Sequence, residues 1–328
     1  MIILGIESSC DETGIGIVKN GRIVANVIAT QEDIHAVYGG VVPELASRAH
    51  CSRIDGLLAL ALKQSGCSIG DVTQIGVTHT PGLKGALLVG VAFGSALGIS
   101  LRVPVYRVNH LHAHLAANFL NRALDFPALG LVVSGGHTSL FVLHSPLEIS
   151  CIGRTLDDAC GETFDKVGRL LNLGFPGGPA VEREARKGNE TMVKFPTALL
   201  GRESLDFSFS GLKTSVSYYA KRHGSGNIPD VCAGFQKAVA DTLCEKVRRA
   251  VRRYPGRTFI CGGGVVGNRY LVHRLRAVCR ELDIRVFIPP EPLCRDNGAM
   301  IAILTSCLVK EKIPAPTPSI VTEPTSRC

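Results

Sequence analysis

Three features that mark other classes of protein are missing from this sequence. Its twelve cysteines include no CxxC pair, which argues against zinc ribbons and, in a cytosolic chain, against a disulfide framework. The N-terminus has no charged segment followed by an apolar core, and no apolar run reaches about 18 residues, so nothing indicates export or membrane insertion. We therefore expect a cytoplasmic protein without membrane contacts, whose cysteines are mostly small buried side chains.

Length and composition indicate a folded α/β protein with two domains. The chain has 328 residues, of which 45% are hydrophobic and 36 are glycine, so it can bury two cores joined by many turns. Its formal net charge of +8 suits an anionic partner. Arg248, Arg249, Arg252 and Arg253 fall on neighbouring turns of a predicted helix and are candidates for that contact. A solvated helix face explains them equally well.

A strand–turn–strand pattern opens two parts of the chain. Residues 2–6 and 15–18 flank one turn rich in hydroxyl and acidic side chains, and residues 128–133 and 139–143 flank another. Helical periodicity follows each strand pair, over residues 43–65 and 157–171, which predicts two related α/β halves. We place the halves at 1–126 and 127–296, followed by a terminal helix that returns to the first half (297–312) and a loose tail (313–328).

Glycine-rich turns occur at three comparable places. Besides the two turns that open the halves, residues 262–268 (GGGVVGN) link a third strand to a predicted helix over 269–282. Such turns expose backbone N–H groups that can surround phosphate oxygens, although a single Gly-Gly pair is more often an ordinary hairpin. Three of them together predict a nucleotide in a cleft between the duplicated domains.

A histidine-rich stretch follows Asn109. Asn109 can cap a helix on which His110 and His114, at positions i and i+4, project from one face while His112 points away. Two imidazoles at that spacing often begin a transition-metal site, although an isolated pair is more often a chance cluster.

Further motifs follow one another in order from Met1 to about Leu308. They are ESSCDET (7–13), YGGVVPELASR (38–48), the 110/114 histidine pair, SGGHT (134–138), GETFDK (161–166), PGGP (176–179), DFSFSGLKT (206–214) and DNGAM (296–300). In these motifs the chain resembles the bacterial TsaD family, the tRNA N6-adenosine threonylcarbamoyltransferases, formerly described as O-sialoglycoprotein endopeptidases. The resemblance implies the fold shared by actin, Hsp70 and sugar kinases. It also implies transfer of the threonylcarbamoyl group from threonylcarbamoyl-AMP to the N6 amino group of the adenosine 3′ of the anticodon, in tRNAs reading ANN codons, with release of AMP.

The resemblance also implies the site residues. His110, His114 and Asp296 would bind a divalent metal, and two nitrogens with one carboxylate suit iron(II) or zinc; Asp296 could instead cap the last helix. The adenylate would contact Val133, Ser134, Gly135, Gly136, His137, Asp165, Gly178 and Asn268. Without the resemblance, Asp165 could be a charge near a helix N-terminus, Gly178 a turn glycine and Asn268 a helix cap. His137 could be a proton shuttle or a hydrogen-bond donor.

The first turn supplies candidates for catalysis. Asp11 and Glu12 are candidates for positioning or deprotonating the attacking amine, and a solvated turn is the alternative interpretation. The expected partners are tRNA, threonylcarbamoyl-AMP, a TsaB-like paralogue and a TsaE-like ATPase.

Three rival functions fit the sequence less well. A zinc metalloprotease of the HExxH type needs Glu after its first histidine, and Leu111 stands there. An ATPase or kinase of the same fold would not need the histidine pair. A scaffold without enzymatic activity would not need the metal and nucleotide residues.

Overall fold

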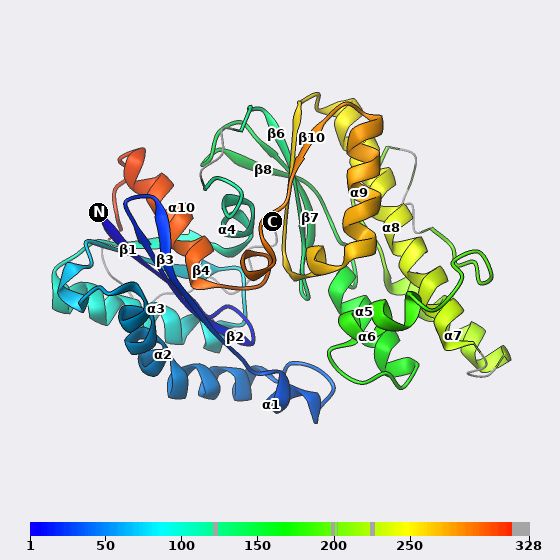
Figure 1. The fold of residues 1–328 in the computed structure, drawn as a ribbon, viewed down its shortest axis with the longest axis horizontal. Coiled ribbons are helices and arrows are strands. Elements are labelled where there is room, and N and C mark those ends of the chain that lie inside the picture. The colour runs from blue at the N-terminus through cyan, green and yellow to red at the C-terminus, as the bar shows by residue number, and fades with distance from the viewer. Residues whose placement is uncertain (121–123, 198–200, 202, 224–226, 317–328) are drawn as a thin grey trace. The chain divides into compact units, whose positions relative to one another are not determined.

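The computed structural model describes residues 1–120, 124–197, 201, 203–223 and 227–316. The chain divides into two compact units (Figure 1). Unit 1 comprises Met1–Ala123 and Pro289–Arg327, and unit 2 comprises Leu124–Ile288. Most of the predicted tail, residues 317–328, lies outside the described residues.

Unit 1 contains a five-stranded mixed sheet in the order β3-β2-β1-β4-β5. Its strands are β1 (Ile2–Glu7), β2 (Glu12–Lys19), β3 (Arg22–Thr30), β4 (Gln74–Thr80) and β5 (Val105–Asn109). The first three strands pair antiparallel, and β4 and β5 extend the sheet in parallel with β1. Crossover helices join the parallel strands, as parallel pairing requires.

Unit 2 repeats this topology. Its strands are β6 (Ala128–Val133), β7 (Thr138–Leu143), β8 (Ile149–Arg154), β9 (Thr258–Gly262) and β10 (Arg285–Phe287), in the order β10-β9-β6-β7-β8. Here β6, β7 and β8 pair antiparallel, while β9 and β10 continue the sheet in parallel with β6. Read from its other end, this order is β8-β7-β6-β9-β10, which matches β3-β2-β1-β4-β5 of unit 1 strand for strand. Because the strand directions match too, the predicted duplication is confirmed.

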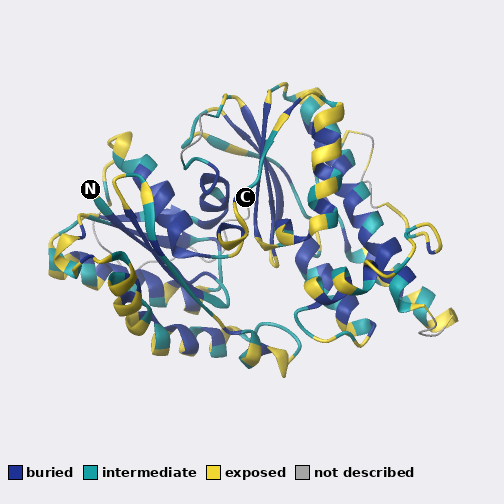
Figure 2. Ribbon diagram, in the orientation of Figure 1, coloured by how far each residue is buried: buried dark blue, intermediate teal, exposed yellow. Residues whose placement is uncertain are grey.

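Helices cover both faces of the unit 1 sheet. These helices are α2 (Pro43–Ser65), α3 (Lys84–Leu101), α4 (His110–Ala116) and α10 (Gly298–Lys310). The short helix α1 (Glu32–Ala36) follows β3. Successive side chains of β1 point to opposite faces. A Cβ on Gly5 would lie 2.1 Å from the carbonyl oxygen of Gly298 on α10, whereas Ile6 faces the glycines of α3. The absence of a side chain at Gly5 therefore lets α10 lie directly on the strands (Figures 1 and 2).

Helix α3 is more apolar than we expected from the sequence. Among the described residues it alone combines 18 residues with a mean hydropathy of 1.6, enough to cross a membrane by length and composition. The expectation that no such run exists is wrong for this helix. Its buried face carries Gly90, Gly94 and Gly98, which contact Ser8, Val77 and Val105 of unit 1. These contacts explain the composition, because a helix that packs closely on a sheet needs small apolar residues.

The helices of unit 2 pack on one another and on the sheet face that carries Leu129, Leu131 and Leu140. They are α5 (Cys160–Leu170), α6 (Gly177–Ala185), α7 (Ser210–His223), α8 (Ile228–Arg253) and α9 (Arg269–Glu281). Strands β6, β7 and β9 are buried along their whole length, and Phe164 of α5 packs edge-on against Phe235 of α8 with ring centroids 5.0 Å apart. Short 3₁₀ helices occur at Ile69–Asp71, Gly264–Gly267 and Glu291–Leu293.

The cysteines behave as the sequence analysis expects. Eleven are described, all are free thiols, and seven of them are buried. Burial raises the pKa of the Cys160 thiol strongly and that of Cys294 to about 11, so these side chains are neutral packing groups at physiological pH.

Candidate functional site

The histidine pair lies at the start of α4, where β5 ends. The Asn109 Oδ1 atom accepts hydrogen bonds from the backbone N–H groups of Leu111 at 2.9 Å and His112 at 3.1 Å, so Asn109 caps the helix as predicted. The His110 and His114 rings lie side by side on the buried face, with centroids 4.6 Å apart. His112 is only half-buried. The i, i+4 prediction for the two inner histidines is confirmed.

Asp296 approaches both histidines from the start of α10. The cap of that helix is Asn297, whose side chain accepts from the backbone N–H of Met300 at 3.0 Å. The interpretation of Asp296 as the helix cap is therefore wrong. Its Oδ1 atom instead lies 3.0 Å from His114 Nε2 and 3.5 Å from His110 Nε2.

These three side chains fit a divalent metal. One potential ligand atom of each lies within 4.8 Å of the others, and bonds of about 2.0–2.2 Å would bring neighbouring ligands about 3 Å apart. Both ring nitrogens of His114 are buried without a hydrogen-bond partner of good geometry among the described residues. The Nε2 atom has only the Asp296 carboxylate nearby, at 3.0 Å; since buried polar atoms are normally satisfied, a buried nitrogen facing a ligand carboxylate fits a bound cation. Two imidazoles and one carboxylate suit iron(II) or zinc.

Glu7 stands behind His110 and was not singled out by the sequence analysis. It belongs to the end of β1 rather than to the following turn, and none of its surface is exposed. Its Oε2 atom accepts from His110 Nδ1 at 3.0 Å and from Thr78 Oγ1 at 2.6 Å, while its Oε1 atom accepts from the backbone N–H of Ser9 at 2.6 Å. The available signal was a carboxylate that ends a strand of otherwise apolar residues.

The charges of this cluster are tightly coupled. Burial favours the neutral form of Glu7, but the charge and hydrogen bond of His110 outweigh it and lower the pKa of Glu7. Burial opposes protonation of His110 too, yet Asp296 and Glu7 together raise its pKa to about 9. Burial lowers the pKa of His114. The cluster therefore attracts positive charge, as a cation site must.

The first turn brings two more carboxyl groups to the same cluster. Glu12 begins β2, its side chain is 15% exposed, and its Oε2 atom accepts from the backbone N–H of Asp296 at 3.0 Å. Burial and the negative charge of Asp296 raise the pKa of Glu12 to about 8. Burial also raises the pKa of Asp11. The interpretation of Glu12 as a solvated turn residue is wrong, since it supports the backbone of a candidate ligand.

A buried histidine of α2 fixes this turn. His50 Nδ1 lies 2.7 Å from Thr13 Oγ1, and His50 Nε2 donates to the carbonyl oxygen of Cys10 at 3.0 Å. Burial lowers the pKa of His50, which favours the neutral ring. The backbone beside Asp11 and Glu12 is therefore held by a long-range contact.

In unit 2, the predicted adenylate loop joins β6 to β7. Its tight turn is closed by the backbone N–H of Ser134, which donates to the carbonyl of His137 at 2.8 Å. A Cβ on Gly135 or Gly136 would meet no atom within 4 Å. Both residues are exposed, and within the described part of the chain their amides donate to no protein group. Two such N–H groups beside open space can receive an anion.

The third glycine loop packs against this one. Gly263 has a φ of 97°, and a Cβ there would lie 2.3 Å from the carbonyl oxygen of Val133. Glycine is therefore required, because any side chain would separate the loop from the end of β6. The close packing places Asn268, at the start of α9, on the same unit as the Ser134–His137 turn.

The other predicted adenylate residues have structural partners as well. Asp165 Oδ1 accepts from the backbone N–H of Gly177 at 2.7 Å and so fixes the start of α6. Asn268 caps α9 by accepting from Leu271 N at 3.0 Å, and its Nδ2 donates to Gln236 Oε1 at 2.8 Å. A Cβ on Gly178 would meet no atom within 4 Å. The helix-cap interpretation of Asn268 is thus confirmed, and it does not exclude ligand contact.

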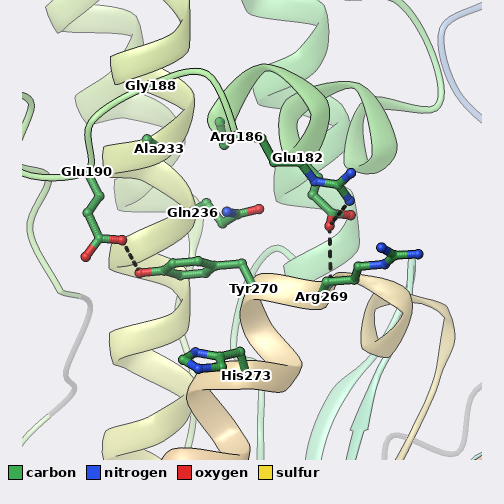
Figure 3. A pocket seen from close by; sticks show the side chains of 10 residues that line it. Glu182, Arg186, Gly188, Glu190, Ala233, Gln236, Arg269, Tyr270 and His273 are labelled. Atoms are coloured by element: carbon green, nitrogen blue, oxygen red, sulfur yellow. Dashed lines mark hydrogen bonds and ion pairs between the residues drawn. The ribbon is translucent and has the colours of Figure 1, made fainter.

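A cavity of about 390 Å³ lies between α6, α8 and α9 (Figure 3). Gln236, the partner of the Asn268 amide, lines it, as does Glu182, one turn after Gly178. Tyr270 crosses the cavity and donates to Glu190 Oε2 at 2.6 Å. Polar and aromatic groups therefore line space next to the predicted adenylate residues.

The four arginines of α8 are not equivalent. Arg248 pairs with Glu281 at 2.8 Å, and Arg249 pairs with Glu245 and donates to the carbonyl oxygen of Gly201 at 2.7 Å. Arg252 and Arg253 are exposed at the end of the helix. Neighbouring Lys246 is buried, which lowers the pKa of its amino group to about 8. Only part of this basic stretch is available to an anionic partner.

The sequence matches one family over most of its length. The TsaD model, described as tRNA N6-adenosine threonylcarbamoyltransferase, matches residues 22–303. The tRNA N6-adenosine threonylcarbamoyltransferase of Kosmotoga olearia is 46% identical over 317 residues, which cover 96% of each chain. That of Syntrophomonas wolfei is 45% identical over 306 residues, covering 92% of this chain and 90% of the relative.

Solved structures at low sequence identity share the fold. HypF of T. kodakarensis superposes with a TM-score of 0.65 at 16% identity, over 95% of this chain and 48% of HypF. Component A of the Acidaminococcus fermentans (R)-2-hydroxyglutaryl-CoA dehydratase superposes with a TM-score of 0.55 at 15% identity, over 93% of this chain and 97% of that one. These likenesses support the predicted actin-like fold alone. The sequence match, by contrast, spans the motifs of both units, and the chain belongs to the TsaD family of tRNA N6-adenosine threonylcarbamoyltransferases.

Proposed function

We propose that this enzyme transfers threonylcarbamoyl from threonylcarbamoyl-AMP to the N6 amino group of the adenosine 3′ of the anticodon, in tRNAs that read ANN codons. The observation that carries the proposal is the convergence of His110, His114 and Asp296 in a chain that matches the TsaD model over residues 22–303. This cluster of three potential metal ligands also disfavours the ATPase or kinase alternative, because that chemistry does not need a pair of histidine ligands. The protease alternative lacks the general base of an HExxH site.

The two units supply different parts of the reaction. In unit 1, His110, His114 and Asp296 hold a divalent metal, with iron(II) favoured and zinc the alternative. Such an ion supplies Lewis acidity toward carbonyl or phosphate oxygen. In unit 2, the amides of Gly135 and Gly136 receive the phosphate of the adenylate, and Val133, Ser134, His137, Asp165, Gly178 and Asn268 complete its pocket. His137 acts there as a hydrogen-bond donor.

The transfer step requires a base and a leaving group. The N6 nitrogen of the tRNA adenosine forms a bond to the carbamoyl carbon, and the bond from that carbon to the phosphate oxygen breaks to release AMP. The proton lost by the amine goes to Glu12, with Asp11 beside it positioning the amine. Burial raises the pKa of the Glu12 carboxyl, which makes its carboxylate a stronger base than an exposed one.

A reconstituted reaction tests this function. Purified protein, threonylcarbamoyl-AMP and unmodified tRNA are combined with a TsaB-like paralogue and a TsaE-like ATPase. We propose these two partners, and a cytoplasmic location, by analogy with the family. Mass spectrometry of the digested nucleosides should show threonylcarbamoyladenosine, and AMP should appear in equal amount and only with tRNA present. Phosphorylation of a small molecule, or AMP release without modified nucleoside, would contradict the proposal.

The adenylate pocket gives a first prediction. Asp165→Asn should weaken binding of a non-hydrolysable adenylate analogue by about 1–3 kcal/mol, because a charged acceptor for hydroxyl groups is removed. The amide oxygen can still accept from Gly177 N, so the melting temperature should change little. Calorimetric titration measures the affinity. Glu184→Gln on α6, which removes only the surface pair with Lys187, is the control, and equal affinities in both variants would remove Asp165 from the pocket.

The end of α8 gives a second prediction. Replacing Arg252 and Arg253 with glutamine should shallow the slope of log affinity for tRNA against log salt, by roughly 0.7–0.9 for each phosphate that the protein no longer neutralises. Replacing Arg248 and Arg249 should leave the slope unchanged, because both are held by Glu281, Glu245 and backbone carbonyls. Filter binding at several salt concentrations measures both variants. An unchanged slope in the first variant would assign all four arginines to a solvated or structural face.

A further inference from the structure

We propose that Glu7 is a positioning residue for the metal site. It fixes the tautomer of His110, so that the Nε2 lone pair, rather than an N–H, faces Asp296 and the metal. The inference deepens the proposed function, because it rests on the metal site formed by His110, His114 and Asp296.

The position of Glu7 follows from the alternation of β1. Gly5 faces α10, so Glu7, two residues further on, lies on the same face of the sheet, while Ser8 points to α3. Helix α4 packs against α10 on this face and carries His110. The strand thus places a carboxylate directly behind the imidazole, at the one end of β1 where the ring can reach it.

The hydrogen bonds of Glu7 determine the direction of the contact. A carboxylate can only accept, so Ser9 N, Thr78 Oγ1 and His110 Nδ1 must all donate to it. With its proton on Nδ1, the neutral His110 ring has its lone pair on Nε2. That Nε2 atom is the one 3.5 Å from Asp296 Oδ1. Every partner of Glu7 is therefore consistent with a single tautomer, the one that can bind a metal.

The two histidines differ in this respect. His114 Nδ1 is buried without a hydrogen-bond partner among the described residues, so no such group sets its tautomer. A fully buried carboxylate is also costly unless it is paired. Packing alone would favour an apolar side chain at position 7, whereas orienting His110 requires an acceptor there.

Glu7→Gln tests the inference because it keeps the size and shape of the side chain. The amide oxygen must take the Oε1 position to accept from Ser9 N, since the amide nitrogen there would oppose another donor at 2.6 Å. The NH₂ group then faces His110 Nδ1, and Ser9 Oγ, 3.2 Å from the same atom, can donate to it as well; Nδ1 becomes an acceptor, which moves the ring proton to Nε2. Zinc affinity, measured by competition with a chelator, should fall roughly 10–100-fold, the usual effect of losing an outer-shell partner.

A spectroscopic readout separates this effect from loss of stability. In metal-free protein labelled with ¹⁵N-histidine and held above the raised pKa of His110, about 9, so that the ring is neutral, the ¹⁵N shifts of His110 should report an Nδ1–H ring in the wild type and an Nε2–H ring in Glu7→Gln. Ser8→Ala is the matched control: Ser8 is also buried and donates to the carbonyl of Ala86 at 2.9 Å, but it faces α3. It should lose stability while keeping zinc affinity and tautomer.

The outcomes distinguish this inference from the proposed function, because zinc binding needs neither tRNA nor adenylate. Wild-type zinc affinity and an Nδ1–H ring in folded Glu7→Gln would overturn the positioning role and leave the metal site intact. A wild-type protein that binds neither zinc nor iron(II) would overturn both.

Discussion

His114→Ala is expected to lose the bound metal almost completely and with it the transfer activity. The side chain supplies one of three candidate ligands, so metal affinity should fall by more than the roughly 10–100-fold expected for an outer-shell partner. His110→Ala and Asp296→Ala should behave alike. Elemental analysis of purified protein measures metal content, and single-turnover transfer measures activity.

Thermal stability gives an independent readout of the same site. A ligand present at 100 times its dissociation constant stabilises the folded state by about 2.7 kcal/mol, so added zinc should raise the melting temperature of the wild type. The rise should vanish in His114→Ala even if the cavity left by the ring lowers the starting value. His114→Asn, which fills more of the space, guards against a misfolded variant.

His112→Ala is the control on the same helix. His112 does not share the helix face of His110 and His114, and it is only half-buried. Metal content and the zinc-induced rise in melting temperature should therefore match the wild type. A full site in His114→Ala, or an empty one in His112→Ala, would contradict the assignment of the ligands.

Periodicity predicted the architecture well because the duplicated sheets follow elementary patterns. The helix expected at 43–65 forms as α2, Pro43–Ser65, and the strand expected at 128–133 forms as β6. The helix expected from 157 begins only at Cys160. Asp157 instead accepts hydrogen bonds from the hydroxyl and backbone groups of residues 208–210. That contact spans about fifty residues, so no local pattern could show it.

The metal ligands were predictable to different degrees. Helical spacing alone places His110 and His114 together, since both belong to one short segment capped by Asn109. Asp296 is far away in the sequence, and only the family resemblance joined it to the histidines. Glu7 escaped notice because its role depends on the alternation of β1 and on the position of α4, neither of which its neighbours in the sequence reveal.

Glu12→Gln is expected to slow threonylcarbamoyl transfer by about 10²–10⁴-fold, the usual contribution of a positioned general base. The amide retains an oxygen that can accept from the backbone N–H of Asp296, so the candidate metal ligand should stay in place. It has no site that can take the proton of the attacking amine. Metal content and adenylate affinity should therefore remain close to those of the wild type.

Glu12→Ala distinguishes the two roles that the structure gives this side chain. It removes the base and also the acceptor that supports Asp296, so it should lose both transfer and part of the metal affinity. Single-turnover assays with saturating adenylate and tRNA, run beside calorimetric titrations of metal and adenylate analogue, measure both variants. Full transfer by Glu12→Gln would exclude Glu12 as the base and leave it a purely structural partner of Asp296. Because Asp11 is the other carboxylate of this turn, the same assay on Asp11→Asn would then decide whether it takes the proton.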